Sequence, residues 1–507
     1  MTKKVIYRRL LLVVFAAAIM ASCKDKSSVS YTNVIPADAS IVVSFHLKAI
    51  WDKVGLNEKE NGDVKRKLTG ILKEGIRKES FDLLEKIVEN PTESGIDMEA
   101  PFYIFTQKTD DAWGIAVKVG NRHKLKALLD VMVSEGMATP VKKRNGYSYV
   151  RFENSHTVCA FNEDVVLAIH SGNNNYIGID SLMLQKKENS ISVSPVFRNM
   201  LAKKGEIKFM ATPKGLFPDE FSTSNNPKDA AILSNLSFEN GKINLQVESH
   251  TQNEKLNAWL ETNKPQEFSF IERFPISTLA YLTLHLDGGK LVDLIQEDEE
   301  LYDSFLSFAG VETLKAWEEF IRFIDGDLSV GLLDVSIYSA SLAAYAKVKD
   351  NRLALQAFYN LIDLSIGKEA ITSTGNGSYV YKFDGQNIYF GVEDKQFYVT
   401  NNKKIVDRIP QKIHGKTLKD AEFASNMKET SLYLVVNMEN MFNLPVVRLL
   451  TLGGRGMHSA YMDMASGISY LEVTGKGNMG EINLCFKDKK TNALKQIVNI
   501  MKQHSGL

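Results

Sequence analysis

The sequence predicts an α+β protein made of two tandem homologous repeats, each a mainly antiparallel sheet covered by helices. Three observations predict this fold class. Short runs of alternating apolar and polar residues, the period of a half-buried strand, occur along the whole chain. Stretches with helical periodicity lie in separate blocks between these runs, an arrangement typical of α+β folds. The third observation is that one series of short motifs occurs twice, in the same order.

The repeated motifs define the two halves of the chain. They include PADASIVVSFHL at 36–47 against PISTLAYLTLHL at 275–286, SYV at 148–150 against 378–380, and INL at 243–245 against 482–484. Chance produces isolated matches of this kind but not a collinear series. We therefore predict repeat one at residues 31–262 and repeat two at 266–505, with the polar segment before Pro265 as the junction.

The elements within each repeat follow from local patterns. Val43 and Phe45 alternate with Ser44 and His46, so the first strand is expected to bury its Val43 side. The turn residues at 145–146 and 375–377 precede further alternating runs, which predicts hairpins. Amphipathic patterns predict helices over 122–135 and 352–364. Each sheet is expected to bury one face under its helices.

The first 22 residues have the pattern of a signal peptide. A basic start is followed by an apolar run from Leu10 to Met20, which is too short to cross a bilayer. The next residues, ending at Cys23, resemble a bacterial lipobox, in which the cysteine thiol is lipidated and palmitate is one of the acyl groups. We therefore expect residues 1–22 to be removed, Cys23 to anchor the chain and residues 23–30 to form a polar tether. A plain secretory signal is the alternative.

Composition excludes some partners. The chain has 61 basic and 61 acidic residues, and removal of residues 1–22 would leave a slight acidic excess because that segment holds four cations and no acid. Such a balance does not favour binding to nucleic acid. Cys159 and Cys485 lie in apolar alternating segments, where buried free thiols are expected in place of a disulfide.

No catalytic, cofactor-binding or metal-binding residue is predicted. The sequence contains no GxSxG, HExxH, phosphate-binding or EF-hand motif. His46 and His285 occupy equivalent repeat positions and are interpreted as histidines on the polar side of a strand, although paired ligands or bases are the alternative. The acidic pairs at 163–164 and 393–394 are interpreted as turn residues, with cation sites as the alternative.

The repeats differ most in the segment after Phe442, which is longer and more apolar than its counterpart after Phe217. The pattern predicts a helix over 444–452, a glycine loop over 453–456 and a second short helix rich in methionine. Flexible methionine-rich surfaces adapt to varied partners. We therefore predict Arg455, Met457 and His458 as partner-binding residues. The alternative is a helical hairpin that packs on its own sheet.

The lipobox, the IPADASIVVSFHL strand and the duplicated module resemble an uncharacterised lipoprotein family of Bacteroides-type bacteria, a domain of unknown function. The resemblance implies a cell-envelope protein with a two-repeat fold, and it implies no activity. We expect an outer-membrane lipoprotein of the bacterial envelope, facing either side, whose lipid anchor contacts the membrane. Its expected role is binding or scaffolding of an envelope protein or surface polymer without catalysis. The alternatives are a hydrolase acting on glycan or peptide in a cleft between the repeats, or a carrier of an apolar ligand.

Overall fold

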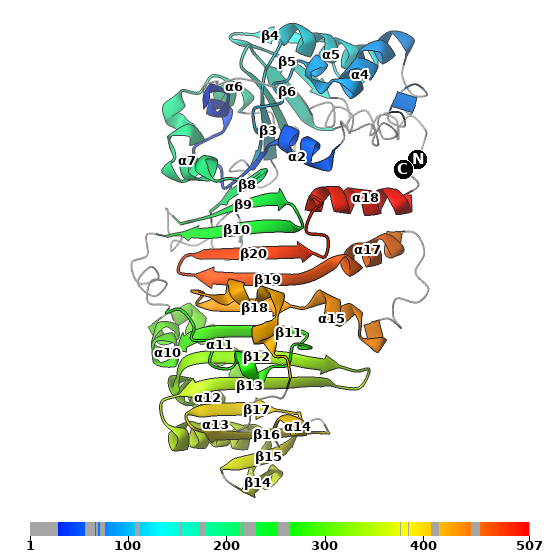
Figure 1. The fold of residues 1–507 in the computed structure, drawn as a ribbon. Helices are drawn as coiled ribbons and strands as arrows, with labels where there is room; N and C mark the ends of the chain where they lie inside the picture. The colour runs from blue at the N-terminus through cyan, green and yellow to red at the C-terminus, as the bar shows by residue number, and fades with distance from the viewer. Residues whose placement is uncertain are drawn as a thin grey trace. The chain divides into compact units, whose positions relative to one another are not determined.

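The fold is described from a computed structural model (Figure 1). The description covers residues 29–55, 77–106, 112–152, 155–171, 178–212, 230–251, 264–297, 299–375, 377–383, 385–406, 415–447 and 457–505, with residues 66, 69–70, 73 and 215. Within these ranges, no helix is long and apolar enough to cross a membrane.

The chain forms two compact units. Unit 1 contains residues 1–253 and 488–507, and unit 2 contains residues 254–487. The C-terminal helix α18 (Ala493–Ser505) therefore belongs to unit 1, whereas the sequence pattern placed it at the end of repeat two. The predicted repeat boundaries themselves stay a prediction.

The sheet of unit 1 is antiparallel at every described pairing. Its strand order is β4-β5-β6-β7-β3-β2-β1-β8-β9-β10. The strands are β1 (Ile41–Phe45), β2 (Phe102–Thr106), β3 (Ala112–Lys118), β4 (Lys142–Arg144), β5 (Tyr147–Phe152), β6 (Thr157–Phe161), β7 (Val165–Ser171), β8 (Ile207–Ala211), β9 (Ala231–Glu239) and β10 (Lys242–His250).

Both faces of this sheet carry a core. Ala116 and Val117 are neighbours on β3 and point to opposite faces, and each belongs to a different buried cluster. One face packs against α4 (Lys78–Glu89) and α5 (Arg122–Ser134). The other packs against η1 (Val29–Val34), α6 (Ile179–Met183), η5 (Ile191–Val193) and α7 (Pro195–Ala202). The remaining elements are α2 (Leu47–Val54), η3 (Pro91–Ser94) and η4 (Lys187–Asn189).

Unit 2 has the same strand order with its own strands, β14-β15-β16-β17-β13-β12-β11-β18-β19-β20, again antiparallel throughout. They are β11 (Ala280–Asp287), β12 (Ile324–Val335), β13 (Ala340–Val348), β14 (Ile371–Gly375), β15 (Ser378–Phe383), β16 (Gln386–Glu393), β17 (Gln396–Thr400), β18 (Leu432–Val436), β19 (Ile468–Lys476) and β20 (Met479–Phe486).

The sheet of unit 2 also has two cores. One face packs against α12 (Val311–Arg322) and α13 (Asn351–Ile366). The other packs against η6 (Ile271–Arg273), α14 (Lys403–Val406), η8 (Leu418–Asp420) and η9 (Glu422–Met427). The remaining elements are α10 (Gly288–Glu297), α11 (Glu299–Ala309), η7 (Lys368–Ala370), α15 (Met438–Phe442) and α17 (Met457–Ser466).

The predicted mixture of helices and antiparallel strands is confirmed, and so are several of its parts. A hairpin joins β4 to β5, with Gly146 in the left-handed region. Helix α5 lies in the range predicted for a helix and starts after Asn121, whose side chain accepts the backbone N–H of Lys124 (3.1 Å). It buries a face that includes Leu125, Leu128 and Leu129. Cys159 and Cys485 are buried free thiols. Burial raises the pKa of Cys159 to about 12, which makes this thiol unreactive.

Two expectations about burial are wrong. Helices were expected on one face of each sheet, but both faces are covered. The first strand was expected to bury its Val43 side most deeply, but Ser44 is fully buried while Val43 is half-buried. The same holds for Thr283 and Leu282 on β11. A sheet with a core on each face has no face exposed to solvent. The alternating pattern therefore predicts a strand, but it does not predict which side of the strand is more buried.

Candidate functional site

The candidate site is a pocket of about 480 Å³ within unit 2, called the unit 2 pocket below. This volume lies in the range of roughly 300–1,000 Å³ that is common for small-molecule sites. Its walls are mainly apolar and come from Pro275, Leu279, Leu333, Tyr345, Ile405 and Leu444. Most of the polar side chains that line it are Arg273, Asp334, Asn402, Lys404 and Asn440.

Aromatic packing positions η6 at one side of the pocket. The rings of Phe270 and Phe274 lie 5.5 and 5.6 Å from the ring of Tyr345, one stacked and one edge-on. The fully buried Asp327 holds the preceding segment, because its carboxylate accepts the backbone N–H groups of Glu267 (3.1 Å) and Ser269 (2.8 Å). These contacts fix the backbone that carries Arg273.

Asparagine side chains fix the opposite rim. The Asn440 amide donates to the backbone carbonyl of Ile276 (3.2 Å), which ties α15 to the segment before β11. The Asn402 amide donates to Ser341 Oγ (2.9 Å), and its oxygen accepts the backbone N–H of Lys404 (3.1 Å). Hydrogen bonds from side chains to the backbone hold these segments in place where strand pairing does not.

The pocket has a positive rim over an apolar floor. Arg273 donates through Nη2 to Gln396 Oε1 (3.2 Å). Lys404 is exposed and makes no ion pair with any described residue. Among the described residues that line the pocket, Asp334 is the one carboxylate. The lining therefore carries an excess of cations.

Tyr345 forms part of the floor and is 4% exposed. Its hydroxyl makes no hydrogen bond within the described part of the chain. Burial raises the pKa of Tyr345 to about 12, although the neighbouring Arg273 acts in the opposite direction. The hydroxyl is therefore protonated at neutral pH and is available as a hydrogen-bond donor.

A second hollow of about 740 Å³ lies on the other side of η6, and Arg273 lines it as well. Both carboxylates that line it are already paired: Glu272 with Lys419 at 2.6 Å, and Glu267 with Lys347. Exposed pairs of this kind contribute little to binding or stability. We therefore take the first pocket as the candidate site.

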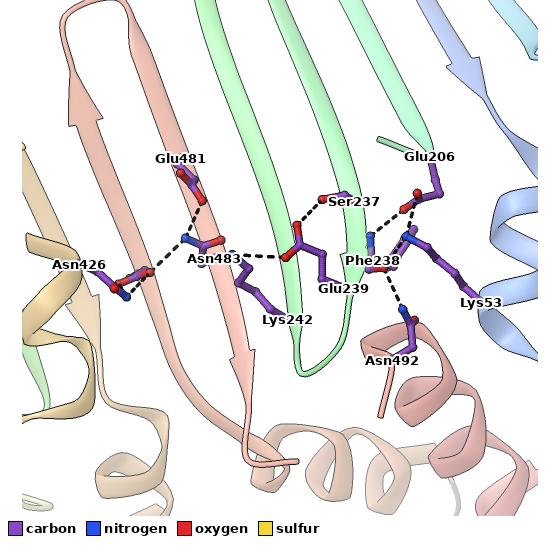
Figure 2. A network of polar contacts seen from close by, with 11 residues as sticks. Lys53, Glu206, Ser237, Phe238, Glu239, Lys242, Asn426, Glu481, Asn483 and Asn492 are labelled. Carbon is purple, nitrogen blue, oxygen red and sulfur yellow. Dashed lines mark hydrogen bonds and ion pairs between the residues drawn. The ribbon is translucent and has the colours of Figure 1, made fainter. Parts of the chain in front are cut away.

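One cluster of buried polar side chains elsewhere in unit 2, centred on Glu472, is satisfied by hydrogen bonds within the protein. Glu472 is 2% exposed and accepts hydrogen bonds from the Tyr433 hydroxyl (2.9 Å), from Asn426 (3.1 Å) and from Asn483 (3.1 Å). Figure 2 shows Asn426 and Asn483 with the neighbouring Glu481. Burial and the adjacent Glu472 raise the pKa of Tyr433. The cluster is closed by the protein's own partners, so its role is structural.

The described residues that line the pocket include none of the sequence-predicted site residues. Cys23 and Arg455 lie outside the described residues. Met457 and His458 belong to α17, and their side chains are not described. Asn443 caps the C-terminal end of α15, and residues 445–447, within the predicted helix over 444–452, are helical. Asn443 and Leu444, at the start of that predicted segment, do line the pocket.

His46 directly follows β1 and precedes α2, and His285 lies on β11. His285 Nδ1 lies 3.9 Å from Asp327 Oδ1, whose oxygens already accept the two backbone N–H groups. Glu163 and Asp164 lie in the turn between β6 and β7, whereas Glu393 ends β16 and Asp394 follows it in the turn to β17. Among the described residues, no group of three or more His, Cys, Asp and Glu side chains could hold a metal ion.

Arg273 and Tyr345 were missed by motif searches because neither belongs to a motif. The one signal for Arg273 is a basic residue inside the aromatic segment FSFIERF at 268–274. The other residues of the site come from the segment before β11, from β12, from α14 with the preceding Asn402, and from the region of α15, which are distant in sequence.

The fold and pocket define a protein with two antiparallel α+β units, one of which has a site of small-molecule size. Residues 31–494 match the family described as a domain of unknown function (DUF4836), and the chain belongs to that family. No curated protein matches the chain.

Solved structures of TP0453 are similar to parts of the chain. Crystal form IV shares 14% identity and covers 43% of this chain and 79% of TP0453. Crystal form III shares 12% identity and covers 47% and 88%, and crystal form I shares 14% identity and covers 44% and 80%. The TM-score is 0.27 in each case.

Proposed function

We propose that this chain is a lipid-anchored protein of the bacterial cell envelope that acts by binding and not by catalysis. The observation that carries the binding role is the unit 2 pocket, which has apolar walls and a cationic rim. The segment that ends at Cys23, with its basic start and short apolar run, supports the lipid anchor and the envelope location. The outer membrane is the proposed site of the anchor.

The lining of the pocket argues against the hydrolase alternative at this site. Glycoside hydrolysis commonly needs two carboxylates across the scissile bond. The described lining residues supply Asp334 alone, and this exposed carboxylate accepts the backbone N–H of Val335 (2.9 Å). The carrier alternative fits the same lining better, since most of the wall is apolar.

We also propose that the two units arose by duplication. Two observations support this origin: the strand order of unit 1 recurs in unit 2, and the collinear motifs lie on corresponding strands. Helix α5 and helix α13 also begin alike, after Asn121 and Asp350, whose side chains cap the first turn. The segment with Arg455, Met457 and His458 interrupts this symmetry, and we propose it as a contact for a protein partner.

The anchor is tested by the variant Cys23→Ser. Without the thiol no acyl chain can be attached, so we expect the protein to move from the membrane fraction to the soluble periplasmic fraction. Ser27→Ala, in the same polar tether, is the control and should stay with the membranes. Sedimentation of the Cys23→Ser protein with membranes after a high-salt wash would contradict the proposal.

A further inference from the structure

The shape of the unit 2 pocket selects for a ligand with an apolar body. Leu279 and Tyr345 are buried at its floor, and Leu333, Ile405 and Leu444 continue the apolar surface outward. These residues come from separate elements held by the sheet and by the asparagine bonds of the rim. Transfer of hydrocarbon from water onto such a surface is favourable because apolar area is removed from water.

The polar groups of the pocket select for an anion. Arg273 reaches the pocket from η6 and Lys404 from α14, so two cations come from two different elements. A guanidinium has five N–H donors in a planar fork, a geometry that suits a carboxylate, and the Arg273 guanidinium also donates to Gln396. The Tyr345 hydroxyl adds a neutral donor without a partner among the described residues.

The corresponding place in unit 1 lies in a buried hydrophobic cluster. Ala116 on β3 pairs with Leu167 on β7, just as Tyr345 on β13 pairs with Tyr398 on β17. Ala116 is packed in a cluster with Val34, Ile179 and Phe197, all of them apolar. The strand order alone therefore does not produce a pocket with an arginine and a free hydroxyl, and these features belong to unit 2.

We propose that the unit 2 pocket binds an anionic amphiphile, a carboxylate on a hydrocarbon chain. Arg273 and the Tyr345 hydroxyl hold the carboxylate, and the chain lies against Leu279, Leu333 and Ile405. The proposal deepens the binding role given above and rests on it. It requires no lipid anchor on the protein.

The experiment is calorimetric titration of the purified full chain carrying Cys23→Ser with decanoate. Three matched probes separate the contributions: decanol has the chain without the charge, decyltrimethylammonium has the opposite charge, and acetate has the charge without the chain. We expect saturable binding of decanoate and at least tenfold weaker binding of all three others. Absence of decanoate binding, or equal binding of decanol, overturns the proposal.

Three variants test the residues. Arg273→Gln should lower the affinity for decanoate about tenfold to a hundredfold, and Tyr345→Phe should lower it about threefold to tenfold. The effect of Arg273→Gln is larger because a charge-assisted hydrogen bond contributes more than a neutral one. Arg352→Gln, on the exposed surface of α13, is the control and should not change the affinity. Decanoate affinity that is unchanged in Arg273→Gln and Tyr345→Phe overturns the assignment of the site.

Lys404→Gln keeps the test decisive if Arg273→Gln fails to fold, because Lys404 is exposed. This variant should bind decanoate severalfold more weakly than the parent and bind decanol equally well. If its affinity for decanoate equals that of the parent, the proposed role of the Lys404 charge is overturned. The result of the decanoate titration can also be distinguished from the result of the membrane fractionation that tests the lipid anchor. Failure of decanoate binding leaves the fractionation result intact, whereas a Cys23→Ser protein that stays on membranes leaves a positive titration intact.

Discussion

At the scale of the residue, His46 makes unit 1 sensitive to acid. Burial lowers the pKa of His46 from 6.5, and the nearby Lys208 lowers it further, while Glu206 and Glu99 act in the opposite direction. As the pH falls below about 6.5, His46 therefore becomes protonated in the unfolded chain while it is still neutral in the folded chain. Stability from this site is present above that pH and is lost as the pH falls through the lower folded pKa.

We expect His46→Gln to reduce this acid sensitivity by less than about 1 kcal/mol, because the side chain is only partly buried. The measurement is amide hydrogen exchange of β1 and β8 above and below pH 6.5, in the parent and the variant. Lys208→Met should act in the same direction by removing the neighbouring cation. An unchanged pH dependence in His46→Gln would refute the explanation.

At the scale of the element, Gly331 allows β12 to pass under the aromatic cluster of η6. A Cβ at this position would lie 2.3 Å from Cε1 of Phe274. The Phe274 ring cannot move freely, since it packs 4.9 Å from Tyr281 and 5.6 Å from Tyr345. Gly331→Ala should therefore lower the free energy of unfolding of unit 2 by about 1–3 kcal/mol, as overpacking does.

The matched control is Gly480→Ala on β20, where the nearest atom to a Cβ is the carbonyl oxygen of Thr474 at 3.6 Å. Urea unfolding should place this variant within about 0.5 kcal/mol of the parent. Phe274 follows Arg273 directly, so a shift of Phe274 would also move Arg273. Gly331→Ala should therefore also lower the affinity for decanoate. If the two alanine variants had the same free energy of unfolding, η6 would move aside without loss of stability, and the prediction would be wrong.

At the scale of the whole molecule, unit 1 is built from two distant parts of the chain. The Asn492 amide donates to the carbonyl of Phe238 (2.9 Å), which also accepts from Lys53 Nζ (2.6 Å), as Figure 2 shows. The backbone N–H of Gly241 donates to the carbonyl of Thr491 (2.9 Å). The C-terminal segment thus closes unit 1 beside β9, β10 and α2.

A chain that ends after Lys487 should have a destabilised unit 1 and an unchanged unit 2. We expect a loss of about 2–4 kcal/mol, from two hydrogen bonds at about 1 kcal/mol each and the apolar contacts of α18. Hydrogen exchange reports on the two units separately. Met501→Ser, at a 56% exposed position of α18, is the control. Faster exchange in unit 2 alone would contradict the assignment of α18 to unit 1.

The sequence by itself determined the local structure of this protein. Strands and helix α5 follow from periods of two and 3.6 residues, and the β4–β5 hairpin follows from Asn145-Gly146, because these signals depend on neighbours in the chain. The depth of burial of Ser44 and Thr283 depends on what covers each sheet face, which alternation does not encode. The roles of Cys23, Arg455, Met457 and His458 stay predictions.

Only the tertiary structure decided where the candidate site lies and which segment completes unit 1. Arg273, Tyr345 and Lys404 are far apart in sequence and carry no motif, so nothing local links them. They meet because β13 pairs with β17, which places α14 at the end of β17 close to Tyr345, and because Phe270 and Phe274 pack on that same tyrosine. Sheet register and aromatic packing join distant residues, and these are properties of the folded chain as a whole.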